Sequence, residues 1–470
     1  MDVRIGKTTA QLLSKMEMLK ALFASLFLLV SSVALGQNGI TDKCAGDRIA
    51  YDFPIVLRGA SELYGAKLRG ISAFRFLDGK WESVPVQIDE VNSSGDYVLE
   101  NGLPYTSKTG DNVYNGNDEF SIEGRSLGDE FSLEQVPREF HQNTAAAFLF
   151  RKLRFCAGKQ YIGTVLLRLG PETAPIVPVQ AAVHFQENPA QISSDIYRYE
   201  FEKKNPVLLG QVWLRSEKDD TGNISEHQVI EKSSFVMPLR LPWWAPNFTL
   251  TDSNFISSIE CWRSGPVRSI VAVGVKFRSF LSLFNLHMFS ELVFYRNKFQ
   301  VPTEIQFTFD PSSYLRPGSG LFYSLTFPAG KGWEVETNLE DLPPVSAKEV
   351  KDRGRTALSQ EVFYARGRRP EGGFVVNVRV DPAARKLVPP PFFVRKEMFL
   401  DPVYLKPWPD ILGPGGDMGV YLDISGVRTG VYDFGLDLLL SRKADEMLRD
   451  YGSVEAQWVL LDIPTGSPAK

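Results

Sequence analysis

Short runs of alternating apolar and polar residues recur along most of the chain, separated by turns rich in Gly, Pro, Asn and Asp. Alternation with a period of two places one face of a strand toward a core, so this pattern predicts β-strands. The dipeptide Asp78-Gly79 between two such runs predicts a hairpin. One short helix is predicted at residues 441–452, with Ser441 as its N-cap and Gly452 as its stop. We therefore expect an all-β protein with little helix.

The order of these runs predicts two β-sandwich-like units. Residues 37–172 are expected to form an N-terminal β domain, and residues 178–470 a second, larger β-sandwich. A Pro-containing connection at residues 170–180 separates the two. The polar stretch at residues 338–360 is a possible subdivision of the larger unit.

The first 36 residues have the pattern of a secretory signal peptide. Lys15 and Lys20 precede an apolar run at residues 21–36, which ends in a small-x-small cleavage pattern. The alternative is an uncleaved membrane anchor. No second apolar run reaches spanning length, so we expect a periplasmic or extracellular protein with no membrane span after cleavage.

Composition and charge narrow the functional classes. A hydrophobic content of 43% over 470 residues is enough for a large core. The net charge is -4 and no long basic run is present, which excludes a typical nucleic-acid binder.

The three cysteines are widely spaced and carry no metal-binding signature. Export would permit a disulfide, and the preferred pair is Cys44 with Cys156, because Cys44 precedes the first strand and Cys156 lies in a later one. The alternative is that these two and Cys261 are all buried thiols.

One predicted strand carries candidate catalytic groups. Alternation places His287, Glu291 and Tyr295 on one face, with about 13 Å between successive members. Because this separation is too long for a hydrogen bond, any catalytic pair needs a group from a neighbouring strand. The candidates for that group are Arg268, His184 and Tyr199.

If the protein is an enzyme, lyase or epimerase chemistry fits these residue types best. A neutral His or Tyr would abstract a proton, and Arg268 would stabilise the developing anion. The alternative is structural, with His287 as a half-buried sheet residue and Glu291 in a cross-strand ion pair.

Tryptophans in loops are candidate substrate-binding residues. Trp243 and Trp244 stand between two prolines, and Trp408 lies in a similar loop. Indole faces stack on the apolar faces of sugar rings, and Arg240 could donate hydrogen bonds beside them. The alternative is a tryptophan plug over the open end of a sandwich.

A cluster of oxygen-bearing side chains is a candidate calcium site, since Ca²⁺ prefers six to eight oxygen ligands. Its members are Asp111, Asn115, Asn117, Asp118 and Glu119. The spacing is not that of an EF-hand, and no other cofactor is indicated. Two alternatives stay open: side chains that cap their own turns, and ion pairs of Asp118 or Glu119 with Arg125 or Arg75.

Two stretches resemble known proteins. The "VPVQIDE" element at residues 84–90, followed by "NDE" at 117–119 and Leu-Gly-Asp at 127–129, resembles the N-terminal region of secreted bacterial and archaeal proteins with no assigned activity. This resemblance covers about residues 70–130 and implies a compact β domain with nothing catalytic.

The second stretch begins with "WRSGPVRSIVAVGVKF" and continues with "HMFSELVFYRNKFQVPTEIQFTF". Its rhythm is similar to that of the galactose-mutarotase-like sandwich over residues 180–335. That resemblance implies a fold that many carbohydrate-active enzymes share, and it assigns no catalytic residue here.

Two functions follow as hypotheses. The first is an exported protein that binds or processes carbohydrate, with a polysaccharide as the candidate partner, in a groove near the candidate residues. The second is a non-enzymatic envelope or assembly protein whose sandwiches bind other proteins. A sandwich fold supports both functions.

Overall fold

The computed structural model describes residues 44, 46–102, 110–137, 148–170, 181–217, 221–277, 287–307, 310–328, 334–337, 363–369, 372–388, 392–395, 418–442 and 454–460. The chain divides into two compact units, Met1–Ala45 and Gly46–Lys470. Every element below belongs to the second unit. It consists of antiparallel sheets with only short helices in the described residues, which confirms the predicted all-β class.

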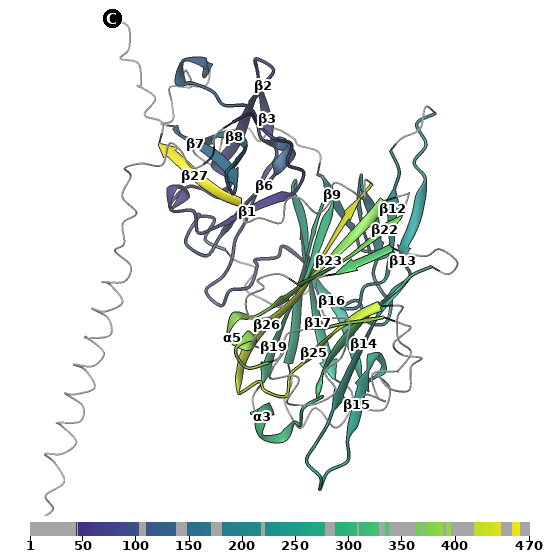
Figure 1. Cartoon of the computed structure of the whole chain (residues 1–470). Coiled ribbons are helices and arrows are strands. Elements are labelled where there is room, and N and C mark those ends of the chain that lie inside the picture. The colour runs from purple at the N-terminus through teal and green to yellow at the C-terminus, as the bar shows by residue number, and fades with distance from the viewer. Residues whose placement is uncertain are drawn as a thin grey trace, which may run out of the picture. The chain divides into compact units, whose positions relative to one another are not determined.

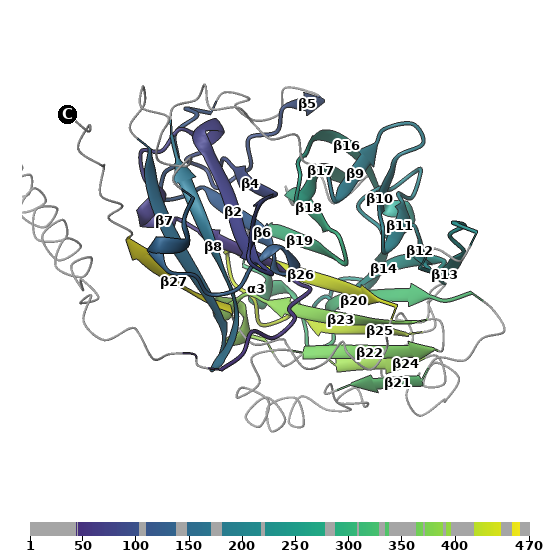
Figure 2. The same cartoon turned by 90° about the horizontal axis from the view of Figure 1, so that it is seen from above.

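Two small sheets form the N-terminal part of this unit. The first has the strand order β27-β7-β8-β2-β3, and the second has the order β1-β6-β4. Figure 2 shows β27 beside β7, so a strand from the far end of the sequence completes this sheet. Their bounds are β1 Pro54–Arg58, β2 Ile71–Leu77, β3 Lys80–Val84, β4 Val86–Asp89, β6 Glu119–Glu123, β7 Leu149–Ala157, β8 Gln160–Leu169 and β27 Val454–Leu460.

A nine-stranded sheet is the largest element, with the order β21-β22-β23-β26-β19-β18-β17-β16-β5. Its central strands run side by side in Figure 1. The bounds are β5 Asn101–Gly102, β16 Phe255–Ser264, β17 Arg268–Phe277, β18 His287–Tyr295, β19 Lys298–Phe307, β21 Glu334–Thr337, β22 Phe363–Arg369, β23 Gly372–Val380 and β26 Gly430–Ser441.

Two five-stranded sheets pack against one face of the large sheet, with the orders β13-β12-β11-β10-β9 and β15-β14-β20-β25-β24. Their bounds are β9 Val183–Gln186, β10 Gln191–Ser194, β11 Tyr197–Glu200, β12 Gln211–Arg215, β13 Glu226–Ile230, β14 Lys232–Leu239, β15 Phe248–Thr251, β20 Gly320–Thr326, β24 Phe392–Arg395 and β25 Met418–Asp423.

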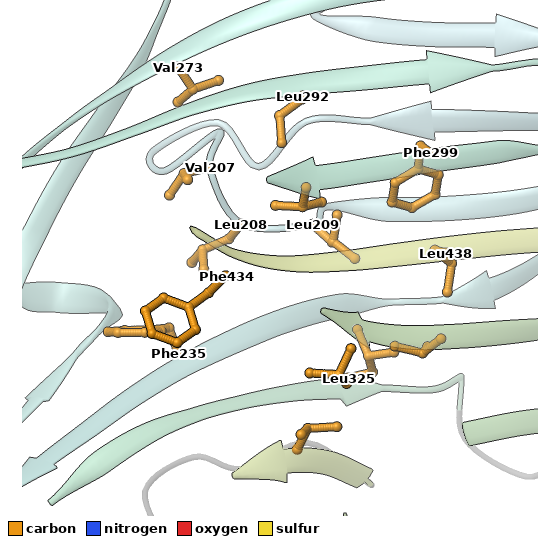
Figure 3. Close-up of a cluster of buried hydrophobic side chains, with 14 of the residues drawn as sticks. Val207, Leu208, Leu209, Phe235, Val273, Leu292, Phe299, Leu325, Phe434 and Leu438 are labelled. Carbon is orange, nitrogen blue, oxygen red and sulfur yellow. The ribbon is translucent and has the colours of Figure 1, made fainter. Parts of the chain in front are cut away.

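The main hydrophobic core fills the space between these sheets. Figure 3 shows Val273, Leu292 and Phe299 of the large sheet near Phe235 and Leu325 of the opposing one. All five side chains are buried. The burial of aliphatic and aromatic side chains on one face is the dominant stabilising contribution to such a sandwich.

The other face of the large sheet, here called the polar face, carries charged groups beside small apolar clusters such as that of Ile270 and Val293, because the alternation continues through each strand. On β18, Leu292 and Phe294 enter the core, whereas Glu291 and Tyr295 point to the opposite face. The same alternation puts Lys298, Gln300 and Glu304 of β19 on that polar face. The sheet therefore presents charged and hydrogen-bonding groups on the face turned away from the core.

The predicted hairpin is confirmed. Strands β2 and β3 pair with Leu77 opposite Lys80, and Asp78 and Gly79 have positive φ angles of 49° and 75°. Positive φ at both central residues is the geometry that Asp-Gly favours in a two-residue hairpin.

The described helices are short. The α-helices are α3 Pro311–Tyr314 and α5 Pro382–Arg385, and the 3₁₀ turns are Ser61–Leu63, Leu68–Gly70, Gly124–Ser126, Leu133–Gln135 and Asp252–Asn254. Ser441, the N-cap of the predicted helix, is the last residue of β26, and residues 443–452 lie outside the described residues. Both predicted boundary stretches, residues 171–180 and 338–360, lie outside them too, so the domain boundaries stay a prediction.

Cys44 and Cys156 are disulfide-bonded, which confirms the preferred pair. The buried Cys261, in β16, is the third cysteine and lies outside this bond. Within the described residues, no helix has the length and hydropathy needed to cross a bilayer.

Candidate functional site

A polar cleft of about 860 Å³ lies on the polar face of the nine-stranded sheet. Strands β17, β18, β19, β26 and β23 form its floor, and β1, β6 and residues 91–97 contribute the opposing side. Three predicted catalytic residues, Arg268, Glu291 and Tyr295, line it together. This cleft is the candidate functional site.

Arg268 is the central cation of the site, and protein groups surround it. Its Nε donates to Asp89 at 2.6 Å, and one terminal nitrogen donates to Glu119 at 2.8 Å. The other terminal nitrogen donates to the Tyr295 hydroxyl at 2.9 Å. Arg268 is only 1% exposed, so the guanidinium is held by two carboxylates and a phenol away from solvent.

The element that positions Arg268 is the "VPVQIDE" stretch. Gln87 Oε1 accepts the backbone N–H groups of Val267 and Arg268 at 3.1 and 2.9 Å, and its amide donates to Asp89 at 2.8 Å. Strand β4, which carries Gln87 and Asp89, pairs with β6, which begins at Glu119. The two stretches singled out by resemblance therefore meet at one arginine.

Electrostatics favour the charged form of this arginine. Burial alone would lower the pKa of the guanidinium, but Asp89 and its other neighbours raise that pKa well above the ordinary value. A buried ion pair stabilises a fold only weakly compared with apolar packing, whereas removal of one partner leaves an uncompensated charge. Arg268 is therefore a structural requirement of the site.

Glu291 is the candidate proton donor. Its Oε1 accepts the backbone N–H of Tyr97 at 3.1 Å. Burial, with added repulsion from Asp96, Glu119 and Glu304, raises the pKa of Glu291 to about 8, although the hydrogen bond from Tyr97 opposes this shift. At neutral pH the carboxyl group is therefore mostly protonated and can donate a proton.

Two further carboxyl groups lie near Glu291. Glu304 of β19 is opposite Asp433 of β26, and both line the cleft. Burial and the charges of Asp433 and Asp96 raise the pKa of Glu304. Groups that give and accept protons therefore occur in one polar cleft, as acid–base chemistry requires.

The predicted roles of the catalytic candidates change in part. Two carboxylates already neutralise Arg268, so the structure does not support its predicted role of stabilising a developing anion. The sequence predicted that a neighbouring strand supplies a hydrogen-bonding partner. This holds for Tyr295 of β18, whose hydroxyl accepts a hydrogen bond from Arg268 of β17. His287 begins β18, but its side chain lies outside the described residues.

The other two partner candidates do not line the cleft. Tyr199 is fully buried in the main core, where its hydroxyl donates to the carbonyl of Leu208 at 3.4 Å. His184 is an exposed residue of β9, in a sheet on the core side of the sandwich.

Among the described residues, the predicted sugar-binding residues Trp243, Trp244 and Arg240 are also absent from the cleft lining. Trp243 and Trp244 are 86% and 67% exposed at a turn between β14 and β15, closed by a hydrogen bond from the Ala245 N–H to the Pro242 carbonyl. The alternative of a tryptophan plug over a sandwich end does not fit this pair, because both indoles face solvent. Arg240 lies at the base of this turn, and Trp408 lies outside the described residues.

The calcium candidates make the hydrogen bonds of a self-capping loop. Asp111 and Asn115 accept the N–H groups of Val113 and Asn117, and Asp118 accepts those of Val91 and Asn115. Among the described residues, no group of three or more His, Cys, Asp or Glu side chains is placed to hold a metal ion. The oxygens of Asp111, Asn115 and Asp118 thus accept backbone N–H groups of the loop and of Val91.

Glu119, the last of these candidates, pairs with Arg268, so the alternative pairing with Arg125 or Arg75 is wrong. Arg75 forms its ion pair with Glu82 at 2.6 Å instead.

Sequence reasoning missed the residues that complete the site. Tyr97 is the clearest case, because its N–H binds Glu291 and its hydroxyl donates to Glu119 at 2.7 Å. It lies 194 residues before Glu291 in the chain. In the sequence it lies in "GDYV", residues 95–98, between the "VPVQIDE" and "NDE" elements, and this position is the sequence signal that points toward it.

We expect Tyr97→Phe to lower the free energy of unfolding by about 1–3 kcal/mol, because Glu119 loses a hydrogen bond in a partly buried site. Urea denaturation measures this change. Tyr64→Phe is the matched control, since the exposed Tyr64 hydroxyl donates only to the carbonyl of Gly59. Equal losses in the two variants would contradict a specific role for the Tyr97 hydroxyl.

Comparisons with known proteins give distant structural similarity alone. No family model matches the chain, and no curated protein matches it. An alpha-mannosidase from Enterococcus faecalis V583 is similar with a TM-score of 0.34 and 10% identity, over 85% of this chain and 47% of the mannosidase. This chain thus spans about half the length of that protein.

A protein described as an aldose 1-epimerase from Escherichia coli K12 is similar with a TM-score of 0.23 and 11% identity, over 49% of this chain and 96% of that one. At these TM-scores neither similarity assigns an activity or a substrate to this chain.

Proposed function

We propose that this protein is exported and binds a carbohydrate in the cleft, where Glu291 serves as the proton donor. The observation that carries the proposal is a largely buried carboxyl group, with a pKa raised by burial to about 8, in the lining of a polar cleft of about 860 Å³. A cleft of this size accommodates a few sugar rings. The predicted leader and the Cys44–Cys156 disulfide support export.

The chemistry proposed for the site is acid–base. Protonated Glu291 donates to a sugar oxygen, and Glu304 or Asp433, once ionised, accepts a proton from a hydroxyl group or from water. Tyr97 orients Glu291 through its backbone N–H, and Arg268 holds the opposing wall in place through Asp89 and Glu119. Arg268 and Tyr97 are thus positioning residues.

A second candidate is a non-enzymatic envelope protein. It is favoured by the exposed pair Trp243 and Trp244, which lies outside the cleft and presents apolar surface to a partner.

Affinity electrophoresis of the purified protein through gels cast with neutral and acidic polysaccharides tests the proposal, with the glycan analysed for conversion afterwards. Wild-type protein should be retarded by at least one glycan. Glu291→Gln should keep the retardation, because the amide still accepts from Tyr97 and donates to the ligand, but it should form no product.

Glu187→Gln is the matched control, since Glu187 is exposed and does not line the cleft. It should behave as wild type in both assays. An absence of retardation in every gel would overturn the proposal. Product formation by Glu291→Gln at the wild-type rate would remove the role of Glu291.

A further inference from the structure

The cleft floor carries a group of cations that the proposed acid–base chemistry does not use. Lys298 of β19 and Arg379 of β23 both pair with Asp437 of β26, at 3.2 and 3.1 Å. Gln300 also donates to both oxygens of that carboxylate at 3.3 Å. One carboxylate faces two cations, so this part of the floor keeps one net positive charge.

Arg379 is placed to meet a ligand. Its side chain is 49% exposed and lines the cleft, whereas the Asp437 side chain behind it is 8% exposed. The guanidinium lies over Gly435, where an added Cβ would come within 2.9 Å of one of its nitrogens. The missing side chain at position 435 thus leaves the space in which the arginine lies along the floor.

The strand register relates Arg379 to Glu291. Arg379 is opposite Gly435, and Gly435 is opposite Pro302. Between β18 and β19, Phe289 is opposite Glu304 and Val293 is opposite Gln300. The same register places Pro302 opposite Glu291. These four residues therefore form one row across four strands, and the guanidinium over Gly435 lies about two strand spacings, roughly 10 Å, from the Glu291 strand. One or two sugar rings span that distance.

We propose that Arg379, with Lys298, forms a carboxylate subsite, so that the ligand of the cleft is an acidic glycan built from uronic acid residues. An arginine fork suits a carboxylate because two parallel N–H groups can bind its two oxygens. This inference rests on the proposed carbohydrate function and names the substrate class for the same cleft.

The acidic residues of the lining do not cancel this subsite. Glu119 pairs with Arg268, and Asp381 caps α5 by accepting the N–H groups of Ala383 and Ala384. Glu304 and Asp433 lie in the next row of the sheet, on the side away from Asp437. Asp96, also in the lining, is close enough to Glu304 and Glu291 for its charge to raise the pKa of both. The floor is therefore positive at one end and negative at the other, which orients an anionic ligand along the strands.

The test uses polygalacturonate, alginate and hyaluronan, each beside its carboxyl-esterified form, in affinity electrophoresis and in calorimetric titration at low and high salt. Wild-type protein should bind at least one acidic glycan about tenfold or more tightly than its ester, and added salt should weaken that binding. Arg379→Gln should lose about tenfold in affinity for the acidic form only, and Arg379→Lys should recover part of the loss.

Arg75→Gln is the matched control, because Arg75 is also an ion-paired arginine on a strand but lies outside the cleft lining. Equal melting temperatures for wild type and Arg379→Gln show that the fold is intact. Binding of neutral or esterified glycans as tight as that of acidic ones would overturn the carboxylate subsite and leave the carbohydrate function standing. No binding of any glycan would overturn both.

Discussion

Replacing Arg268 with methionine should lower the free energy of unfolding by about 3–5 kcal/mol, as expected when one partner of a buried charge network is removed. The Arg268 side chain is 1% exposed and the Asp89 side chain 0%, so the variant removes the nearest cation of a buried carboxylate, at 2.6 Å, and leaves only the more distant Arg263, at 3.6 Å, among its ion pairs in the described residues. Methionine fills much of the arginine stem volume, which limits the contribution of a cavity. Chemical denaturation followed by intrinsic fluorescence measures the change.

A second substitution separates lost charge from lost packing. Arg268→Met combined with Asp89→Asn should recover part of the stability, because the remaining amide carries no charge. The comparison variant is Arg75→Met, which breaks the partly exposed Arg75–Glu82 pair and should cost less than about 1 kcal/mol. If Arg268→Met unfolds within 1 kcal/mol of wild type, the network is not the structural requirement described above.

Ligand binding should weaken as the pH rises through about 8, by up to about tenfold between pH 7 and pH 9. The reason is that Glu291 is a neutral donor below its folded pKa and an ionised acceptor above it. In Glu291→Gln the amide is a neutral donor at every pH, so its affinity should not change over this range. Titration of the glycan identified by electrophoresis, at several pH values, measures both profiles.

Stability gives an independent check of the same pKa. A carboxyl whose pKa is raised on folding binds more protons in the native state, so its contribution is favourable at low pH. That contribution is lost as the pH rises from the ordinary glutamate value, near 4.5, through about 8. Wild-type protein should therefore lose more stability over this window than Glu291→Gln does. Parallel profiles would contradict the raised pKa.

The local pattern of the sequence was enough to predict part of this site. Strands β17 and β18 are neighbours in sequence and in the sheet, and alternation along them puts Arg268, Glu291 and Tyr295 on one face. The Asp78-Gly79 hairpin was predictable for the same reason, since its geometry depends on adjacent residues.

The wall opposite these strands could not be predicted from local pattern. Asp89 and Glu119 lie 179 and 149 residues from Arg268 in the chain, and no periodicity relates such distant positions. From the local sequence alone, the polar residues of "VPVQIDE" are equally well explained as ordinary solvent-facing groups at the end of a strand. Their role follows only from the tertiary contacts that bring Gln87 to the backbone of Arg268.

The position of β27 has a consequence for how the protein reaches its folded state. This strand pairs with β7 along its length, from Val454 opposite Ala157 to Leu460 opposite Arg151, although about 300 residues separate them in sequence. During synthesis β7 is therefore made long before the strand that covers its edge. An uncovered strand edge is a template for pairing with other chains, so the edge of β7 is open to such pairing until β27 has been made.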